Sequence, residues 1–128
     1  MRITGLSTIA SAAVLLGALA APALAGDVGG VWMRSDGAAK VRFSPCGEGY
    51  CGSIVWLRDP GKSPAHVGEQ VFFGMGQSGP NTWTGSAHNP EDGRDYDGAM
   101  TLSGNRLVTK GCALGGMICK STAWVRSK

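Results

Sequence analysis

Four cysteines are the residues whose types and spacing most clearly point to chemistry. They form two near-neighbour pairs, Cys46 with Cys51 in CGEGYC and Cys112 with Cys119 in CALGGMIC. Such pairs form disulfides, hold a metal ion or carry out thiol–disulfide exchange. Structural zinc sites usually have tighter spacings than these, and the chain contains no C-x-x-C redox motif. The sequence therefore favours two disulfides, with a four-cysteine zinc site as the rival.

Hairpin geometry favours local pairing among the three pairings that four cysteines allow. A two-residue turn at Glu48–Gly49 would place the first pair face to face in a narrow site, with Cα atoms about 4.5 Å apart. A turn centred on Gly115–Gly116 would do the same for the second pair, and a helical turn is the alternative for that loop. Each short ring is expected to stabilise the fold by about 2 kcal/mol.

The first 25 residues have the composition of a secretory signal peptide. Arg2 is the only charge in this stretch, an apolar run follows over residues 9–21, and Ala23-Leu24-Ala25 is a small-x-small cleavage sequence. The run is short and rich in Ala and Gly, whereas a membrane span needs about 20 strongly apolar residues. We therefore expect a signal peptide over 1–25, cut after Ala25, and one domain over 26–128. The protein is expected to be periplasmic or secreted, with no membrane anchor.

The charge of the chain is small and dispersed. Lys and Arg number 12 against 9 Asp and Glu, and removal of Arg2 with the signal peptide leaves 11 against 9, a net charge of +2. No two basic residues are adjacent, so the chain lacks the basic patch of a nucleic-acid-binding protein. We expect no nucleic-acid partner.

Candidate catalytic and metal-binding residues are few. His66 and His88 are the only histidines, and nothing in the sequence brings them together. Glu91 beside His88 would make an acid–base pair, but hairpin ends favour such residues, and no nucleophile, zinc or phosphate-binding motif is nearby. The aspartates of EDGRDYD do not have EF-hand spacing. We expect no catalytic residues, no metal and no cofactor, and therefore not an enzyme.

The rest of the chain has the period-two hydrophobic pattern of β-strands. The predicted strand segments are 40–43, 53–57, 83–88, 95–102, 107–109 and 123–125. Turn-forming residues separate them at 35–37, 48–49, 89–93 and 103–105. This spacing predicts an antiparallel meander that closes into a barrel, which removes exposed strand edges. Gly and Pro cluster over 58–80, which we interpret as a long, partly irregular excursion across a barrel mouth.

Several motifs together resemble a bacterial secreted family known as domain of unknown function 2147. They are GVW at 30–32, CGSIVWL at 51–57, WTG at 83–85, NPEDGRDY at 89–96, GCALGGMIC at 111–119 and WVR at 124–126. The resemblance covers nearly all of the mature chain. The chain departs from the family pattern at 58–79. The family usually has a longer insertion there, rich in Asp and Asn-Pro, and this chain has a shorter segment.

The resemblance implies an all-β fold, a small up-and-down, calycin-like barrel of about eight strands related in shape to lipocalins. It implies no established activity. In calycins a Gly-x-Trp sequence opens the first strand, and a basic residue near the last strand packs on that tryptophan. Trp32 and Arg126 occupy those positions, which implies a cation–π contact that closes one barrel end.

Aromatic and Met side chains either line or fill such a barrel, and an interior of this size holds side chains or one small ligand. With about a hundred residues, filling is favoured. The mouth of any pocket is expected at Val71, Phe72, Phe73 and Met75. The leading hypothesis is a non-enzymatic, monomeric binding protein for a small apolar or amphipathic ligand. The alternatives are a protein-binding module, such as an inhibitor of an envelope hydrolase, and a structural or stress protein of the envelope without a specific ligand.

Overall fold

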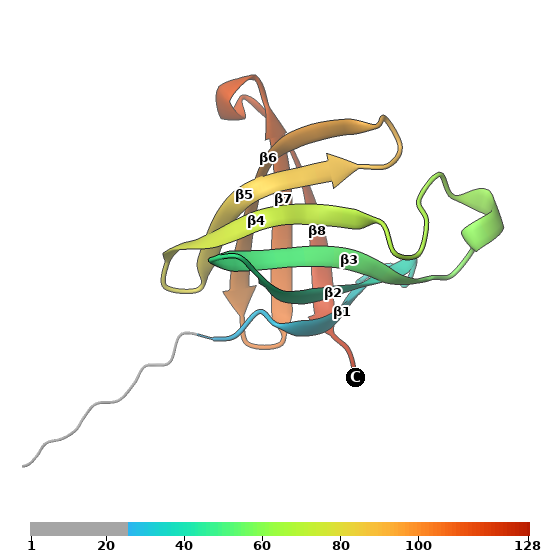
Figure 1. Cartoon of the computed structure of the whole chain (residues 1–128), viewed down its shortest axis with the longest axis horizontal. Coiled ribbons are helices and arrows are strands. Elements are labelled where there is room, and N and C mark those ends of the chain that lie inside the picture. Colours follow the sequence, from blue (N-terminus) through green and yellow to red (C-terminus); the bar gives the residue numbers. More distant parts are fainter. Residues whose placement is uncertain (1–25) are drawn as a thin grey trace, which may run out of the picture.

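The fold is a closed antiparallel barrel of eight strands (Figure 1). A computed structural model describes residues 26–128, so the predicted signal peptide lies outside the described residues. The strands are β1 (Gly30–Arg34), β2 (Ala39–Cys46), β3 (Gly49–Leu57), β4 (Gln70–Gly79), β5 (Thr82–Asn89), β6 (Arg94–Ser103), β7 (Arg106–Ala113) and β8 (Ile118–Arg126). Each strand pairs with the next, and β8 pairs with β1. The predicted up-and-down barrel of about eight strands is confirmed.

In Figure 1, β2 to β5 run side by side, and β7 and β8 cross behind them. Large inward-facing side chains fill the space between. The buried cluster includes Trp32, Val41, Phe43, Ile54, Val71, Phe72, Met75, Trp83, Met100, Leu102, Leu107 and Trp124. The rings of Phe43 and Phe72 lie 5.2 Å apart between centroids, and Phe72 meets Trp124 edge-on at 6.4 Å. The interior is thus occupied by side chains, in agreement with the favoured expectation of filling.

One buried polar pair completes this core. Thr109 is 4% exposed, and its hydroxyl accepts a 2.9 Å hydrogen bond from Nε1 of Trp124. A buried indole N–H without an acceptor would destabilise the fold, so the threonine satisfies the tryptophan.

The first disulfide forms, but the predicted turn at Glu48–Gly49 is wrong by one residue. The turn consists of Gly47 and Glu48, and Gly47 has a φ of 61°. A positive φ at the first central residue alone is the pattern of a type II′ hairpin, which selects glycine there. Cys46 and Cys51 are therefore diagonal neighbours with Cα atoms 5.7 Å apart, not residues directly opposite each other.

The second disulfide has the predicted register. Cys112 lies directly opposite Cys119, with Cα atoms 4.1 Å apart. The loop between them contains a short 3₁₀ turn, η3 (Leu114–Gly116), which is the helical alternative considered for this segment. All four cysteines are in these two disulfides, so the zinc rival is excluded.

The prediction of an irregular segment over 58–80 is right only for its first half. Residues 58–69 form a loop with one 3₁₀ turn, η2 (Pro60–Lys62), and residues 70–79 form the regular strand β4. The register of β4 against β5 shifts between Phe73 and Gly76 and again between Gln77 and Gly79. These bulges interrupt the period of two that identifies a strand in the sequence.

One barrel end is closed by Arg126 and the residues that precede β1. The guanidinium of Arg126 lies 4.2 Å from the ring centroid of Trp32, which confirms the contact implied by the resemblance. Its two terminal nitrogens donate hydrogen bonds to the carbonyl oxygens of Gly29 (3.2 Å) and Asp27 (2.9 Å). Nε1 of Trp32 donates to the carbonyl of the fully buried Val28. The N-terminal segment, residues 26–29, is thereby held against the barrel end.

Replacing Arg126 tests this closure. Arg126→Ala removes the cation–π contact and two hydrogen bonds, so the free energy of unfolding should fall by about 1–3 kcal/mol. Arg126→Lys keeps the charge but lacks the planar guanidinium, so it should lower the free energy of unfolding by a smaller amount. Arg42→Ala, exposed on the outer side of β2, is the matched control. Urea denaturation measures all three, and equal stability of Arg126→Ala and Arg42→Ala would contradict the closure.

Candidate functional site

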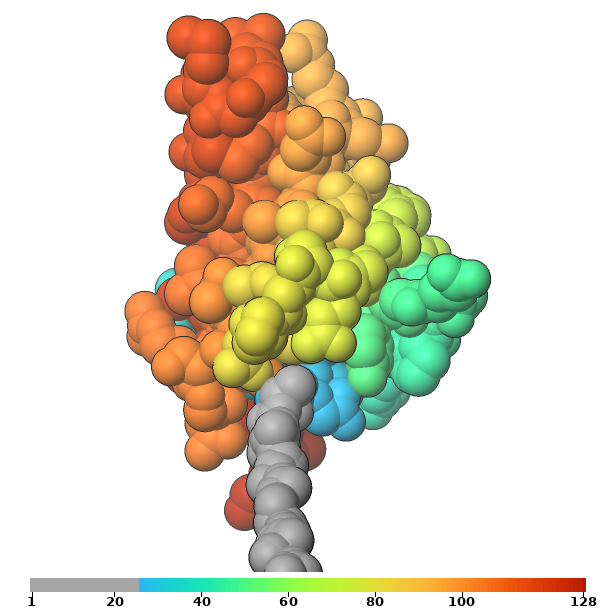
Figure 2. Space-filling model, turned by 90° about the vertical axis from the view of Figure 1, so that its left-hand side faces the viewer, coloured from blue at the N-terminus to red at the C-terminus, as the bar shows by residue number. Residues whose placement is uncertain are grey.

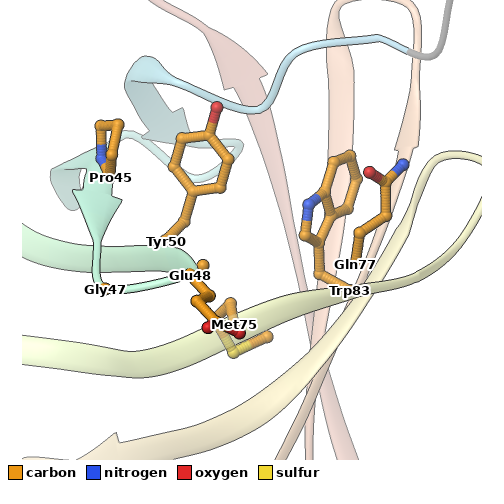
Figure 3. Close-up of a pocket in the computed structure, with 8 residues that line it drawn as sticks. Pro45, Gly47, Glu48, Tyr50, Met75, Gln77 and Trp83 are labelled. Carbon is orange, nitrogen blue, oxygen red and sulfur yellow. The ribbon is translucent and has the colours of Figure 1, made fainter.

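An open cavity of about 240 Å³ lies between the β2–β3 hairpin and the β4–β5 hairpin (Figure 3). Its lining residues are Pro45, Gly47, Glu48, Gly49, Tyr50, Met75, Gln77 and Trp83. Tyr50 and Trp83 stand on its two sides, with Met75 between them (Figure 3). Met75 is fully buried and Trp83 is 3% exposed, so the core itself forms the inner wall.

Strand register brings these residues together. Tyr50 of β3 pairs with Met75 of β4, and Gln77 of β4 pairs with Trp83 of β5. At Gly49 a Cβ atom would lie 2.6 Å from the carbonyl oxygen of Met75, so only glycine allows this close approach of β3 to β4. The cavity therefore has apolar and aromatic inner walls, while the exposed Glu48 and Gln77 stand at its rim.

The hydroxyl of Tyr50 ties the cavity to the N-terminal segment. It donates a 2.8 Å hydrogen bond to Oδ1 of Asp27, which also accepts the amide of Gly29 at 2.8 Å. These donors hold the pKa of Asp27 below its usual value, the Gly29 amide more strongly than Tyr50. The same hydrogen bond raises the pKa of Tyr50. The tyrosine ring is therefore fixed in place with its hydroxyl protonated.

The predicted ligand mouth at Val71, Phe72, Phe73 and Met75 does not form. Val71 and Phe72 are each 7% exposed and belong to the core, while Phe73 is only half-buried, at a position opposite Ser86. Of the four predicted residues, Met75 alone lines the cavity. The physical reason is that this segment is a strand in the barrel wall, where a bulge against β3 turns both Val71 and Phe72 into the core.

Glu48, Tyr50 and Trp83 were not predicted to be partners in one site. The expectations for CGEGYC concern its cysteines and its turn, and Trp83 is only one of the aromatic residues expected to line or fill the barrel. The available signal was the hairpin itself, because a tight turn beside Tyr50 must lie at a barrel end, where inward-facing aromatics border solvent. The pairing of Tyr50 with Met75 depends on the irregular register of β4, which the sequence does not reveal.

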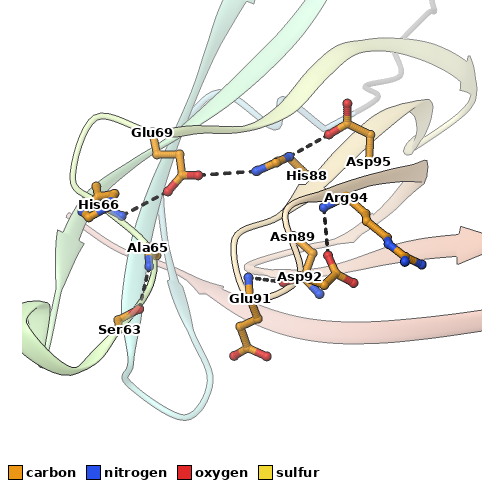
Figure 4. A network of polar contacts seen from close by, with 10 residues as sticks. All are labelled: Ser63, Ala65, His66, Glu69, His88, Asn89, Glu91, Asp92, Arg94 and Asp95. Atoms are coloured by element: carbon orange, nitrogen blue, oxygen red, sulfur yellow. Dashed lines mark hydrogen bonds and ion pairs between the residues drawn. The ribbon is translucent and has the colours of Figure 1, made fainter.

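A polar network joins His88 to two carboxylates on the barrel's outer side (Figure 4). Nδ1 of His88 lies 2.7 Å from Oδ1 of Asp95, and Nε2 lies 3.5 Å from Oε2 of Glu69. The other oxygen of Glu69 accepts the backbone amide of His66 at 3.1 Å. Glu69 thus contacts the ring of His88 but only the main chain of His66, so the network does not pair the two histidine side chains. Glu91 is not a partner of His88 in this network.

This network is suited to holding the 58–69 loop. Both ring nitrogens of His88 face carboxylates, so an imidazolium can donate to both, whereas a neutral ring can donate to only one. Over residues 26–128, no three His, Cys, Asp or Glu side chains are grouped as a metal site would require. The contacts attach the loop residue Glu69 to β5 and β6.

A second, more polar cavity of about 410 Å³ lies beside the β7–β8 loop. Its lining residues are Ser86, Arg94, Asp95, Tyr96, Asp97, Cys112, Ala113 and Leu114. The hydroxyl of Tyr96 donates to Asp92, which lowers the pKa of Asp92 and raises that of Tyr96. This lining carries charges of both signs and contains no buried residue. The second cavity is therefore a weaker candidate site for an apolar ligand.

Comparison with known proteins agrees with the fold. A family model described as "Uncharacterized protein conserved in bacteria (DUF2147)" matches residues 30–126. Among solved structures, protein HP1028 from Helicobacter pylori, described as belonging to the lipocalin family, has a TM-score of 0.64 and 14% identity, covering 80% of this chain and 84% of that chain. At this identity the similarity shows the fold alone. No curated protein matches.

The two disulfides and the match to a bacterial family are consistent with an extracytoplasmic protein. Within residues 26–128, no helix has the length and apolar character needed to cross a membrane.

The lowered pKa of Asp27 predicts a pH-dependent stability. A carboxylate with a depressed pKa stabilises the folded state above its unfolded value, 3.8, and this contribution disappears as pH falls through the folded pKa. The wild type should therefore be more stable than Asp27→Asn above pH 3.8, by less than about 1 kcal/mol because the group is largely solvated. The difference should shrink at lower pH.

Urea denaturation from pH 2 to pH 6 measures this difference. Tyr50→Phe removes one donor to Asp27 and should lose part of the same pH dependence. A stability difference between wild type and Asp27→Asn that stays constant across the range would show that the carboxylate charge is not involved.

Proposed function

The chain belongs to the bacterial family designated DUF2147, and we propose that its barrel is a non-enzymatic binding protein for a small amphipathic molecule with a cationic end. The ligand occupies the cavity between Tyr50 and Trp83. The protein is exported and does this work outside the cytoplasm, where its two disulfides are stable.

The observation that carries this proposal is the division of the cavity into an apolar wall and an acidic rim. Ligand sites typically combine hydrophobic and aromatic walls with a few polar groups that set orientation. Here Met75 and Trp83 supply the apolar wall, the ring of Tyr50 the opposite side, and Glu48 a carboxylate at the rim. An alkyl or aromatic group fits against the wall. An ammonium group would be attracted by the carboxylate of Glu48 and by the faces of the aromatic rings.

The size of the cavity restricts the ligand. A volume of about 240 Å³ lies just below the range of about 300–1,000 Å³ typical of clefts for drug-sized molecules. The barrel interior beyond Met75 is occupied by the core, so a long chain has no further space inward. The proposed ligand is therefore small, or only its end is enclosed.

The ionisable groups at the cavity support binding without catalysis. The hydroxyl of Tyr50 already donates to Asp27, and its raised pKa keeps it protonated. Glu48 is exposed, and the cavity lining contains no serine, cysteine or histidine that it could activate. Acid–base or nucleophilic catalysis needs such a pair within hydrogen-bonding reach.

Charge reversal at the rim tests the proposal. Glu48→Lys should weaken the binding of hexylamine by about 10-fold or more, because the ammonium then meets a like charge in place of a carboxylate. Glu91→Lys makes the same change in net charge in the β5–β6 turn and should leave affinity unchanged. Isothermal titration calorimetry against hexylamine and the uncharged hexanol measures the effect.

Two outcomes would contradict the proposal. One is the absence of saturable binding by any of a panel of small amphipathic amines, together with native mass spectra of protein from the bacterial envelope that contain only the bare polypeptide. The other is equal weakening by Glu48→Lys and Glu91→Lys. A stoichiometric protein partner recovered from envelope extract, without a small ligand, would instead favour the protein-binding alternative.

A further inference from the structure

The β7–β8 hairpin ends in a turn that stands away from the rest of the barrel. In Figure 1 it rises above the other strands, and Figure 2 shows the same orange-red end projecting at the top of the molecule. We call residues 114–118, Leu-Gly-Gly-Met-Ile, the apolar tip. The proposed ligand cavity contains none of these residues.

The apolar tip exposes three large hydrophobic side chains on one short turn. Leu114 is 69% exposed, Met117 83% and Ile118 61%. The other large exposed hydrophobic residues among 26–128 are Trp56, Val67 and Val125, which lie on three separate elements. Scattered exposed hydrophobics are common, but a continuous group at a turn, where polar residues are usual, indicates a contact surface.

The tip has an unusual backbone conformation, and a disulfide joins the strands that carry it. Leu114 has a φ of 55°, in the left-handed region that a bulky side chain rarely adopts. The disulfide between Cys112 and Cys119 joins the two strands directly behind it. A glycine or asparagine at position 114 would relieve the backbone and reduce the exposed apolar surface, so stability and solubility alone do not account for this leucine.

We propose that the apolar tip is a lipid-contacting element, which inserts into the interfacial region of a bilayer surface. A specific protein–protein interface needs about 1,000 Å² or more of buried surface, which a convex turn with three apolar side chains does not supply by itself. A bilayer surface needs only that the apolar side chains reach the boundary between headgroups and acyl chains.

Two lysines lie behind the tip at the depth of lipid headgroups. Lys120 is two residues from Ile118, or about 7 Å along the strand, and the exposed Lys110 lies opposite Ser121 one pair further back. Their ammonium groups are placed to contact anionic headgroups. Asp97, on the neighbouring strand β6, lies opposite Cys112, so charges of both signs are present near the tip. Binding is therefore expected to depend mainly on the apolar side chains and only modestly on lipid charge.

This contact is peripheral and reversible, unlike a membrane anchor. Even a single acyl chain gives only marginal, reversible membrane binding, so three apolar side chains on one turn are expected to bind weakly. The inference is independent of the proposed ligand, because the tip and the cavity lie on different parts of the barrel.

Vesicle co-sedimentation of the disulfide-intact protein tests the inference. The probes are unilamellar vesicles of phosphatidylethanolamine with phosphatidylglycerol, and vesicles of phosphatidylcholine alone. The tip variant Leu114→Gly, Met117→Ser, Ile118→Thr should lower the partition coefficient by about 10-fold or more. The matched control, Val67→Ser with Val125→Thr, removes exposed apolar surface elsewhere and should bind as the wild type does. Near-UV circular dichroism checks that each variant is folded.

A second variant keeps the test independent of the folding of the first. Met117→Trp adds an indole at the most exposed tip position to the four native tryptophans, so the readout is the emission of the variant minus that of the wild type. With vesicles, this difference emission should shift to shorter wavelength and be quenched by brominated acyl chains. No vesicle binding by the wild type, or binding unchanged in the tip variant, would overturn the inference. Tip-dependent dimerisation in analytical ultracentrifugation without lipid would also overturn it, since the occupant would then be a second copy of the chain.

Discussion

The structure depends on the closure of an eight-strand sheet between its first and last strands. β1 and β8 pair over only a few residues, and the side chains of Trp32 and Arg126 meet at that seam. Closure pairs the two edge strands of the sheet with each other and allows the inward faces of both halves to share one core. Arg126 also holds the backbone of residues 27–29, so one guanidinium joins the seam, the N-terminal segment and, through Asp27, the tyrosine beside the cavity.

The elements that follow a local rule could be predicted from the sequence. Alternation in Ala39 to Phe43 buries every second residue, and the same period identified most of the strands. The spacing of Cys112 and Cys119 about two glycines gave their register correctly. Family resemblance placed Trp32 and Arg126 in contact, a relation across 94 residues that no local pattern contains.

The missed features arise where local rules compete. Either Gly47 or Gly49 can be placed in a two-residue turn, and the choice depends on which of them must approach β4, a tertiary constraint. β4 was missed because a bulge against β3, at Val71, places Val71 and Phe72 in the core together and breaks the period of two. The cavity could not be foreseen for the same reason, since it needs the register of three strands at once. The network about His88 likewise requires the 58–69 loop to return to β5.

The barrel thus presents two features at separate places, an acidic-rimmed cavity between the β2–β3 and β4–β5 hairpins and an apolar tip beyond the second disulfide. The claim that the cavity is the binding site is tested most directly by a ¹H–¹⁵N NMR titration of the labelled protein with hexylamine. Binding in the cavity predicts saturable shifts in the amides of 47–50 and 75–77 and in the indole N–H of Trp83. Shifts centred on 71–73 or on the outer network about His88, or no saturable shift, would contradict it.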